Sequence, residues 1–270
     1  MELSKLKKEL INIFKQCNID LQEVNIFLCE ALEVKLEDLF KIENITENQA
    51  KKIKNFAKKR QNGIPIQKIF KRAYFFDYVF YINENVLCPR PETELLVEEC
   101  MKIAKKDDNI LDLCTGSGAI AITIKKKLGA NLVASDISKK ALYVARKNAK
   151  NLNANVKFIC SDMFEKIHQK FDIIISNPPY IPTKDCKNLD KEVLEHDPII
   201  SLDGGLDGLD FYRIITQNAK EYLNKHGKIL LEVGIGEAKK VANMLEKNGF
   251  RTIIKKDYNG IERIVIGESL

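Results

Sequence analysis

The chain has 270 residues, of which 45% are hydrophobic and 30% charged, and its formal net charge is +6. This composition is typical of a globular protein with enough length for one large domain and one small one. The sequence holds no low-complexity segment and no apolar run long enough for a signal peptide or a membrane span. We therefore expect a cytoplasmic protein without a membrane partner. Much of the positive charge comes from lysines on predicted helical faces, where solvation explains it, so charge alone identifies no partner.

Residue counts argue against metal chemistry and against a histidine-based catalytic triad. The seven cysteines are scattered without the spacing of metal ligands, which favours reduced thiols. There are only three histidines, and all of them lie in polar or loop-like surroundings. We therefore expect chemistry that needs no metal.

Residues 1–63 are predicted to form a small helical bundle. Apolar residues recur at helical spacing in three stretches, 3–14, 21–32 and 53–57. Thr46 and Gln49 form a capping-box pattern at the start of the last helix, and Gly63 marks its end. The bundle is expected to recognise the substrate.

Residues 64–90 are predicted to be a linker that contains a β-hairpin. Aromatic and β-branched residues dominate 75–87, and the polar run Asn83-Glu84-Asn85 interrupts them as a turn would. Pro89 and Pro91 end the hairpin, which places the start of the next domain at residue 91.

Residues 91–270 are predicted to form an α/β domain with a doubly wound, mostly parallel seven-stranded sheet. Apolar strands alternate with helical patterns, and we expect strands at 110–113, 132–135, 156–159, 172–176, 229–233, 252–256 and 261–266. Asn259-Gly260 joins the last two strands and is a strong signal for a tight hairpin, so the last strand should be antiparallel.

A glycine-containing loop follows the first of these strands and leads directly into a helix. Backbone N–H groups at such a helix start bind anionic or nucleotide-like ligands. The pattern Gly116-x-Gly118-x-x-Ala121 also fits the dinucleotide fingerprint, so alone it does not separate S-adenosylmethionine from NAD. The cofactor-binding residues predicted here are Cys114, Thr115, Gly116, Ser117 and Gly118.

Acidic residues follow the next two strands, where ligands of open α/β sheets bind. Asp136 is placed to accept hydrogen bonds from two ribose hydroxyls, because Ser138 already fits the N-cap role of the next helix. Asp162 can accept from the exocyclic amine of an adenine, and Met163 can lie against its ring. All three residues are predicted to bind the cofactor.

The most specific motif is Asn177-Pro178-Pro179-Tyr180, directly after the fourth strand. A planar nitrogen is a poor nucleophile because its lone pair is delocalised. If the Asn177 side-chain oxygen and the Pro178 carbonyl each accept one N–H, the nitrogen is held with its lone-pair face toward a methyl donor. The prolines fix the backbone, and Tyr180 supplies an apolar wall or a stacking face. We predict Asn177, Pro178 and Tyr180 as catalytic residues, the whole motif as substrate-binding, and Asn177 as a further cofactor contact.

Over nearly its whole length the sequence resembles the HemK family, the release-factor glutamine methyltransferases. The segments that carry the resemblance are Gly63 to Gln67, Leu87 to Glu94, Asp112 to Gly118, Asn177 to Tyr180 and Ser201 to Arg213. The resemblance implies S-adenosylmethionine as the cofactor and the glutamine of the Gly-Gly-Gln loop of peptide-chain release factors as the substrate. It also implies that the N-terminal bundle grips the release factor.

The sequence departs from the family pattern in the linker, in the cofactor loop and in one later loop. Lys68 and Lys71 replace an aromatic residue and a glycine, Cys114 replaces a frequent glycine, and Glu195 to Pro198 replaces an aromatic-Glu-Pro. Within the matching segments, Arg90 and Glu94 are open to two interpretations, since an ion pair that pins the linker is as consistent with the pattern as a functional role.

Three alternatives remain. A DNA or RNA base-amine methyltransferase, for instance one acting on N6 of adenine, uses the same grip, but it would carry a basic, aromatic-rich recognition face that residues 1–63 lack. If the chain were a non-catalytic module that binds translation factors, we would expect a degraded cofactor loop. Gly116 and Gly118 are present in that loop and argue against this alternative. An NAD dehydrogenase leaves 177–180 unused. We expect a monomer without stable nucleic-acid binding.

Overall fold

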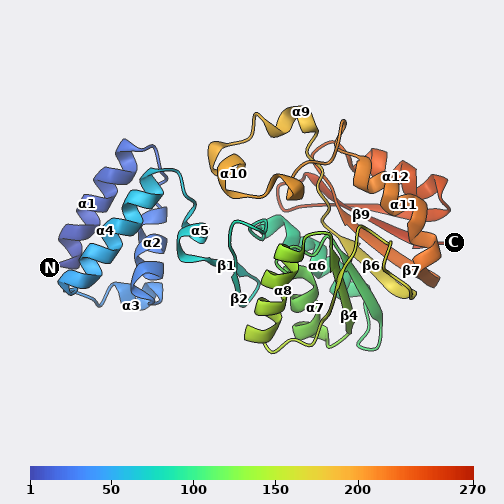
Figure 1. Cartoon of the computed structure of the whole chain (residues 1–270), viewed down its shortest axis with the longest axis horizontal. Coiled ribbons are helices and arrows are strands. Elements are labelled where there is room, and N and C mark those ends of the chain that lie inside the picture. Colours follow the sequence, from blue (N-terminus) through green and yellow to red (C-terminus); the bar gives the residue numbers. More distant parts are fainter. The chain divides into compact units, whose positions relative to one another are not determined.

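The computed structural model describes residues 1–270 and divides into two compact units, 1–71 and 72–270 (Figure 1). The smaller unit is helical, with α1 (Leu3–Gln16), α2 (Glu23–Leu32), α3 (Leu36–Leu39), α4 (Glu47–Gln61) and α5 (Ile66–Phe70). Its core is fully buried and includes Leu6, Leu10, Phe14, Phe27, Leu28 and Ile53. The capping box at the start of α4 is confirmed, since Gln49 N–H donates to Thr46 Oγ1 and Thr46 N–H donates to Gln49 Oε1.

The boundary between the two units follows Lys71 rather than Gly63. Ile66 and Ile69 of α5 are buried in the core of the smaller unit, which extends that unit past the predicted helix end. The segment predicted as a linker is therefore shared between the two units. The roles predicted for the three segments stay predictions.

A β-hairpin follows this boundary and belongs to the core of the larger unit. Its strands are β1 (Arg72–Phe75) and β2 (Tyr78–Tyr81), paired antiparallel. The predicted position of the turn, residues 83–85, is wrong, because the chain turns at Phe76 and Asp77. Phe76 takes a left-handed backbone with φ of 51°, and its N–H donates to Glu94 Oε1 at 2.6 Å. Phe75 and Phe80 are fully buried beside the following helix.

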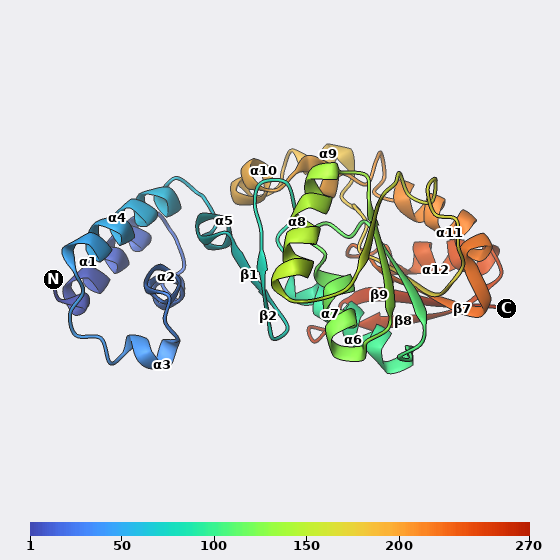
Figure 2. The same ribbon diagram turned by 60° about the horizontal axis from the view of Figure 1, so that its bottom comes forward.

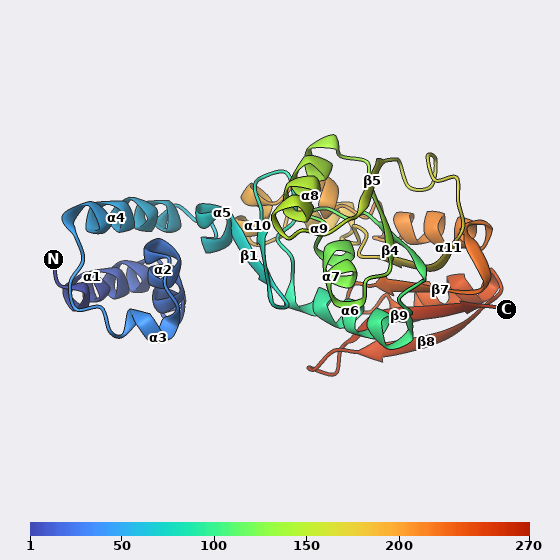
Figure 3. The same cartoon turned by 90° about the horizontal axis from the view of Figure 1, so that it is seen from below.

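The larger unit contains a seven-stranded sheet with the order β5-β4-β3-β6-β7-β9-β8 (Figures 2 and 3). Its remaining strands are β3 (Asn109–Leu113), β4 (Asn131–Asp136), β5 (Lys157–Cys160), β6 (Phe171–Ser176), β7 (Leu223–Glu232), β8 (Phe250–Lys256) and β9 (Glu262–Ser269). Its helices are α6 (Pro91–Ile103), α7 (Ala119–Leu128), α8 (Lys139–Asn151), α9 (Thr183–Cys186), α10 (Lys191–His196), α11 (Asp210–Tyr222) and α12 (Ala238–Lys247), with a 3₁₀ turn at Ile199–Ser201.

The predicted doubly wound sheet is confirmed. Strands β3 to β7 pair in parallel, while β9 runs antiparallel to both of its neighbours, β7 and β8. The predicted hairpin between the last two strands forms around Asn259 and Gly260, with Gly260 at a φ of 78°. Asp257 closes it, because its Oδ1 accepts the N–H groups of Asn259 and Ile261.

Helices cover both faces of the sheet because successive strand residues point to opposite sides. In β6, Ile173 and Ile175 pack with α6 and α7, while Ile174 between them packs with α11 and α12. Both faces of the central strands are therefore buried, which explains their continuous apolar sequences. No helix in the structure has the length and apolar character needed to cross a membrane.

The hairpin predicts how the larger unit responds to truncation. A chain that starts at Arg72 should unfold cooperatively, because residues 72–270 have their own core. A chain that starts at Pro91 loses the buried Phe75 and Phe80, so its free energy of unfolding should fall by at least about 3 kcal/mol relative to the longer chain. Urea denaturation followed by circular dichroism compares the two, and equal stabilities would contradict the assignment of the hairpin to this core.

Candidate active site

The site lies where the strand order reverses, at the carboxyl ends of the parallel strands. The chain leaves β3 toward β4 and β5 on one side, whereas β6 pairs on the other side of β3. The loops after β3, β4, β5 and β6 meet there around a cavity of about 320 Å³. Of the predicted site residues, those that line the cavity are Cys114, Gly116, Asp136, Asp162, Met163, Asn177 and Pro179.

Thr115 and Ser117 do not line the cavity but shape the cofactor loop from behind. Thr115 is buried, and its hydroxyl donates to Asp112 Oδ2 at 2.6 Å. The Ser117 carbonyl accepts from Asn148 Nδ2 at 2.9 Å, and the same amide group binds the backbone of β2. Burial raises the pKa of Asp112 to about 7, against the hydrogen bonds that it accepts. The loop is thus fixed by buried polar contacts.

Three residues of this loop, Cys114, Gly116 and Gly118, have left-handed backbones, and their surroundings differ. A Cβ on Gly116 would meet nothing within 4 Å, whereas one on Gly118 would lie 2.8 Å from Ile122 Cδ1 and 3.2 Å from Ala145 Cβ. Cys114 has a φ of 59°, the kind of conformation that favours glycine. Burial raises the pKa of the Cys114 thiol, so it remains neutral. Gly116 keeps the cavity open, while Gly118 permits the helix to pack.

Asp136 closes β4 and already binds the loop around it. Its Oδ2 accepts Gly116 N–H at 2.9 Å, and its Oδ1 accepts Ser138 N–H at 2.8 Å. Burial raises the pKa of this carboxyl, while these hydrogen bonds act in the opposite direction. Each carboxylate oxygen has a second lone pair, so Asp136 can still accept from ligand hydroxyls. The predicted N-cap role of Ser138 is confirmed, since its Oγ accepts Ala141 N–H at 3.2 Å.

The cavity fits an adenosine-containing ligand by its lining and by its size. Asp136 and Asp162 supply acceptors at the ends of two strands, and the missing Cβ of Gly116 leaves room for close approach of a ligand. Met163, only 8% exposed, lines the same cavity and belongs to the hydrophobic core that contains α11. A volume of about 320 Å³ lies at the lower end of small-molecule sites. The residues present are therefore compatible with S-adenosylmethionine.

The Asn177 to Tyr180 motif leaves β6 at the rim of the cavity. Asn177 Nδ2 donates to Thr93 Oγ1 at 3.1 Å, while Pro179 lines the cavity. Pro178 is buried in the turn. Tyr180 packs against the core beneath α11 and α12, and burial raises the pKa of its hydroxyl to about 12. The structure thus anchors the amide end of Asn177 inside the protein.

A glycine-rich segment, residues 201–213, supports this motif from the outside. Ile181 N–H donates to Leu202 O at 2.9 Å, and Gly204 N–H donates to Ile181 O at 2.8 Å. A Cβ on Gly204 would lie 2.7 Å from Tyr180 Cα, and one on Gly208 would collide with the Tyr180 carbonyl. Only glycine permits the two segments to pack this closely.

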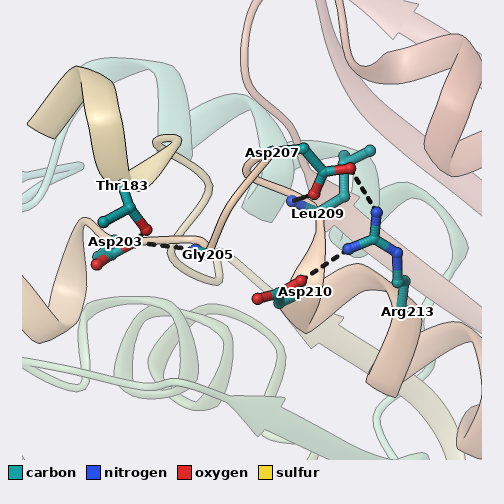
Figure 4. Close-up of polar contacts among 7 residues, drawn as sticks. All are labelled: Thr183, Asp203, Gly205, Asp207, Leu209, Asp210 and Arg213. Carbon is teal, nitrogen blue, oxygen red and sulfur yellow. Dashed lines mark hydrogen bonds and ion pairs between the residues drawn. The ribbon is translucent and has the colours of Figure 1, made fainter.

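Charged side chains hold the same segment in its folded-back path (Figure 4). Asp203 Oδ1 accepts from Thr183 Oγ1 at 2.7 Å and from Gly205 N–H at 2.9 Å. Arg213 in α11 binds Asp207 and Asp210 together, as Figure 4 shows. Because these groups are exposed, they contribute more to the local shape than to stability.

Sequence reasoning missed part of the cavity wall. The additional lining residues are Asn85, Val86, Leu87, Ser135, Ile137, Ser138, Ala141, Ser161, Pro198, Ile200, Ser201, Phe211 and Ile214. Several of them lie in the segments that carried the family resemblance, which was the only available signal. Arg90 and Glu94 make structural contacts, since Arg90 Nη2 pairs with Asp197 Oδ2 at 3.2 Å and Glu94 holds the hairpin turn.

Comparisons with known proteins agree with this geometry. Residues 91–199 match the family described as methyltransferase small domain. A methyltransferase from Pyrococcus furiosus has a similar fold, with a TM-score of 0.57 at 18% identity over 73% of this chain and 91% of that one. The fold and the family match are those of a methyltransferase.

Two relatives define the family more closely. The release factor glutamine methyltransferase of Thermodesulfovibrio yellowstonii is 39% identical over 269 residues, which cover 96% of this chain and 95% of that protein. The one of Clostridium acetobutylicum is 36% identical over 278 residues, which cover 97% and 98%. The chain belongs to the release factor glutamine methyltransferase family.

The two loop glycines provide a matched pair of variants. Gly118→Ala should lower the free energy of unfolding by more than Gly116→Ala does, because only its methyl group collides with the core, while both bear a backbone strain of about 1–2 kcal/mol. Gly116→Ala should instead weaken binding of S-adenosylmethionine, because its methyl group enters the cavity. Chemical denaturation and isothermal titration calorimetry measure the two effects, and the opposite ranking would contradict this division of roles.

Proposed function

We propose that this protein transfers a methyl group from S-adenosyl-L-methionine to the side-chain amide nitrogen of the glutamine in the Gly-Gly-Gln motif of peptide-chain release factors. Two relatives that cover nearly the whole chain are named for this activity, which supports the substrate. The observation that carries the proposal within the structure is the anchoring of Asn177, whose Nδ2 donates inward to Thr93 and leaves Oδ1 as an acceptor. A primary amide presents the N–H groups that such an acceptor needs.

The Asn177 to Tyr180 motif holds and orients the substrate amide. The Asn177 side-chain oxygen and the Pro178 carbonyl each accept one N–H, which fixes the plane of the amide and turns its face toward the methyl donor. These two fixed dipoles also stabilise the positive charge that develops on the nitrogen. Tyr180 supports the turn through its packing. After transfer, the nitrogen gives its extra proton to water.

The cofactor is held by the loops after β3, β4 and β5. Asp136 would accept from the ribose hydroxyls, Asp162 and Met163 would hold the adenine, and the loop around Gly116 would hold the rest of the molecule. When bound, S-adenosylmethionine supplies a methyl group on a positively charged sulfur, which becomes a neutral thioether when the methyl group leaves. Asp112 and Thr115 keep the loop in its binding shape.

We further propose that residues 1–71 bind the release factor and that the protein acts in the cytoplasm as a monomer without stable nucleic-acid binding. A separate core in the smaller unit supports a separate binding role. Its exposed face along α4 carries Lys51, Lys52 and Lys59 around Phe56, the only aromatic side chain of that helix, so the surface is basic but not aromatic-rich and suits an acidic protein partner.

Substrate choice can be tested with tritiated S-adenosylmethionine. The protein is incubated with a purified release factor, with the same factor carrying alanine in place of the motif glutamine, and with DNA or RNA. We expect label only in the unchanged release factor, because only it offers the glutamine amide. Label in a nucleic acid would instead establish a base-amine methyltransferase.

Asn177→Asp tests the amide grip. Aspartate has almost the same size, but it has no N–H₂ group to donate to Thr93, and its charge would lie near the buried Glu232. We expect the turnover rate to fall by about 10²–10³, as for the loss of one preorganised transition-state contact. Cofactor binding, measured by calorimetry, should be largely retained and should change far less than the turnover rate. A turnover rate within a few-fold of the parent, at saturating release factor, would refute the grip.

A further inference from the structure

Two buried polar residues lie behind Asn177: Thr93, which anchors its Nδ2, and Glu232, to which the proposed function gives no role. Thr93 lies in the first turn of α6 and is 4% exposed, and Glu232 ends β7 and is 3% exposed. The parallel pairing of β6 with β7 sets Ser176 opposite Leu231, so Asn177 and Glu232 leave the sheet side by side. Three separate elements therefore bring one amide, one hydroxyl and one carboxyl together.

A hydrogen bond joins two of these groups, and the third interacts with both. Asn177 Nδ2 donates to Thr93 Oγ1 at 3.1 Å. The Glu232 carboxyl lies near enough to the Thr93 and Asn177 side chains that both of them lower its pKa, while its Oε2 is buried without a partner. A buried carboxyl with an unsatisfied oxygen costs stability. The presence of Glu232 thus needs an explanation other than stability.

The chemistry of the carboxylate supplies that explanation. The two ends of an asparagine amide have nearly the same size, so packing alone does not determine which end points outward. An ionised carboxylate only accepts hydrogen bonds, so it requires the N–H₂ end of Asn177 to face it. The Asn177 Oδ1 then faces away from Glu232, toward the cavity that this residue lines.

The Glu232 carboxyl gains or loses its proton near neutral pH. Burial raises the pKa of Glu232 to about 7, while the nearby Thr93 and Asn177 side chains and the charge of Arg263 oppose that rise. The charged and titratable groups around it are Glu92 from α6, Arg263 from β9, Tyr180 from the loop after β6 and Tyr212 from α11. The tyrosines remain neutral at this pH because burial raises both of their pKa values.

We propose that Glu232 and Thr93 are positioning residues that engage the N–H₂ group of Asn177, so that only its Oδ1 faces the substrate nitrogen. The inference rests on the proposed function, because it takes Asn177 as the acceptor for the substrate amide. Protonated Glu232 can also donate, and it then no longer dictates which end of the amide faces it. The orientation is therefore fixed above neutral pH and relaxes as Glu232 gains its proton.

Enzyme kinetics on the full chain test the proposal. Glu232→Gln and Thr93→Val should each lower kcat by about 10–100-fold, as expected when a group that orients a functional side chain is lost. The KM for release factor and the Kd for S-adenosylmethionine should change little, because neither residue lines the cavity. Thr93→Ser keeps the hydroxyl and should restore most of the parent rate. Thermal unfolding of each variant controls for loss of structure.

The pH profile gives a second kinetic readout. The kcat of the parent should fall as the pH is lowered through about 7, where Glu232 gains its proton. In Glu232→Gln this decrease should be absent, because the glutamine amide does not titrate. A parent profile that the substitution leaves unchanged would assign the decrease to another group and contradict the role of Glu232.

A readout without any substrate separates this proposal from the proposed function. The side-chain amide signals of Asn177 in a ¹⁵N–¹H spectrum, identified by their loss in Asn177→Ala, should shift with pH around 7 in the parent and not in Glu232→Gln. If they do so while no release factor is labelled, the positioning role holds and the substrate is wrong. If the pH dependence of these signals is the same in Glu232→Gln as in the parent, the proposal is overturned. It is also overturned if kcat stays within a few-fold of the parent in both Glu232→Gln and Thr93→Val. If Thr93→Ser is as slow as Thr93→Val, Thr93 has no positioning role.

Discussion

The parallel pairing of β3 with β6 is the constraint on which the whole site depends. It runs in register from Ile110 opposite Ile173 to Leu113 opposite Ser176. Cys114 and Asn177, the next residues of the two strands, therefore start their loops side by side. A shift of one residue would turn the apolar side chains of β6 to the wrong faces, so the register is strongly specified by the core. The packing of isoleucines inside the sheet thus sets how the cofactor loop meets the Asn177 motif.

The buried polar groups at the carboxyl edge of the sheet lower the stability of the fold, and they are concentrated at the site. Burial raises the pKa values of Asp112 and Glu232 to about 7, well above the ordinary range of a carboxyl. Each of them therefore favours the folded state fully only at acidic pH, and this contribution is lost as the pH rises toward 7. Their positions beneath the cofactor loop and behind Asn177 are consistent with stability that is given up for a fixed geometry.

The sequence predicts those features that depend on local patterns. It does not predict a feature whose conformation depends on a contact with a residue far away in the chain. The strands follow from apolar runs, and the antiparallel last strand follows from the Asn259-Gly260 turn. The capping box follows from the spacing of two residues within one helical turn. The first hairpin turn does not follow from a local pattern, because Asn83-Glu84-Asn85 is a stronger local turn signal than Phe76, whose left-handed backbone is stabilised by Glu94. The partnership of Asn177 with Thr93 joins residues 84 positions apart, and no motif spacing encodes it.

The geometry also limits what the Asn177 motif can select. Two fixed acceptors hold any planar group that carries two N–H bonds, and a base amine satisfies them as well as a glutamine amide does. Discrimination must therefore come from groups outside the grip. The cavity wall offers such groups in Ile200 and Ile214, which are about half exposed and 39% exposed and which flank residues 201–213, the segment that folds back over the motif. An extended peptide loop can pack against these apolar side chains along its length, whereas a flipped base needs an aromatic face on which to stack. The one aromatic ring of this wall, Phe211, packs partly into the core, so the exposed rim is mainly aliphatic, which supports the proposed polypeptide substrate.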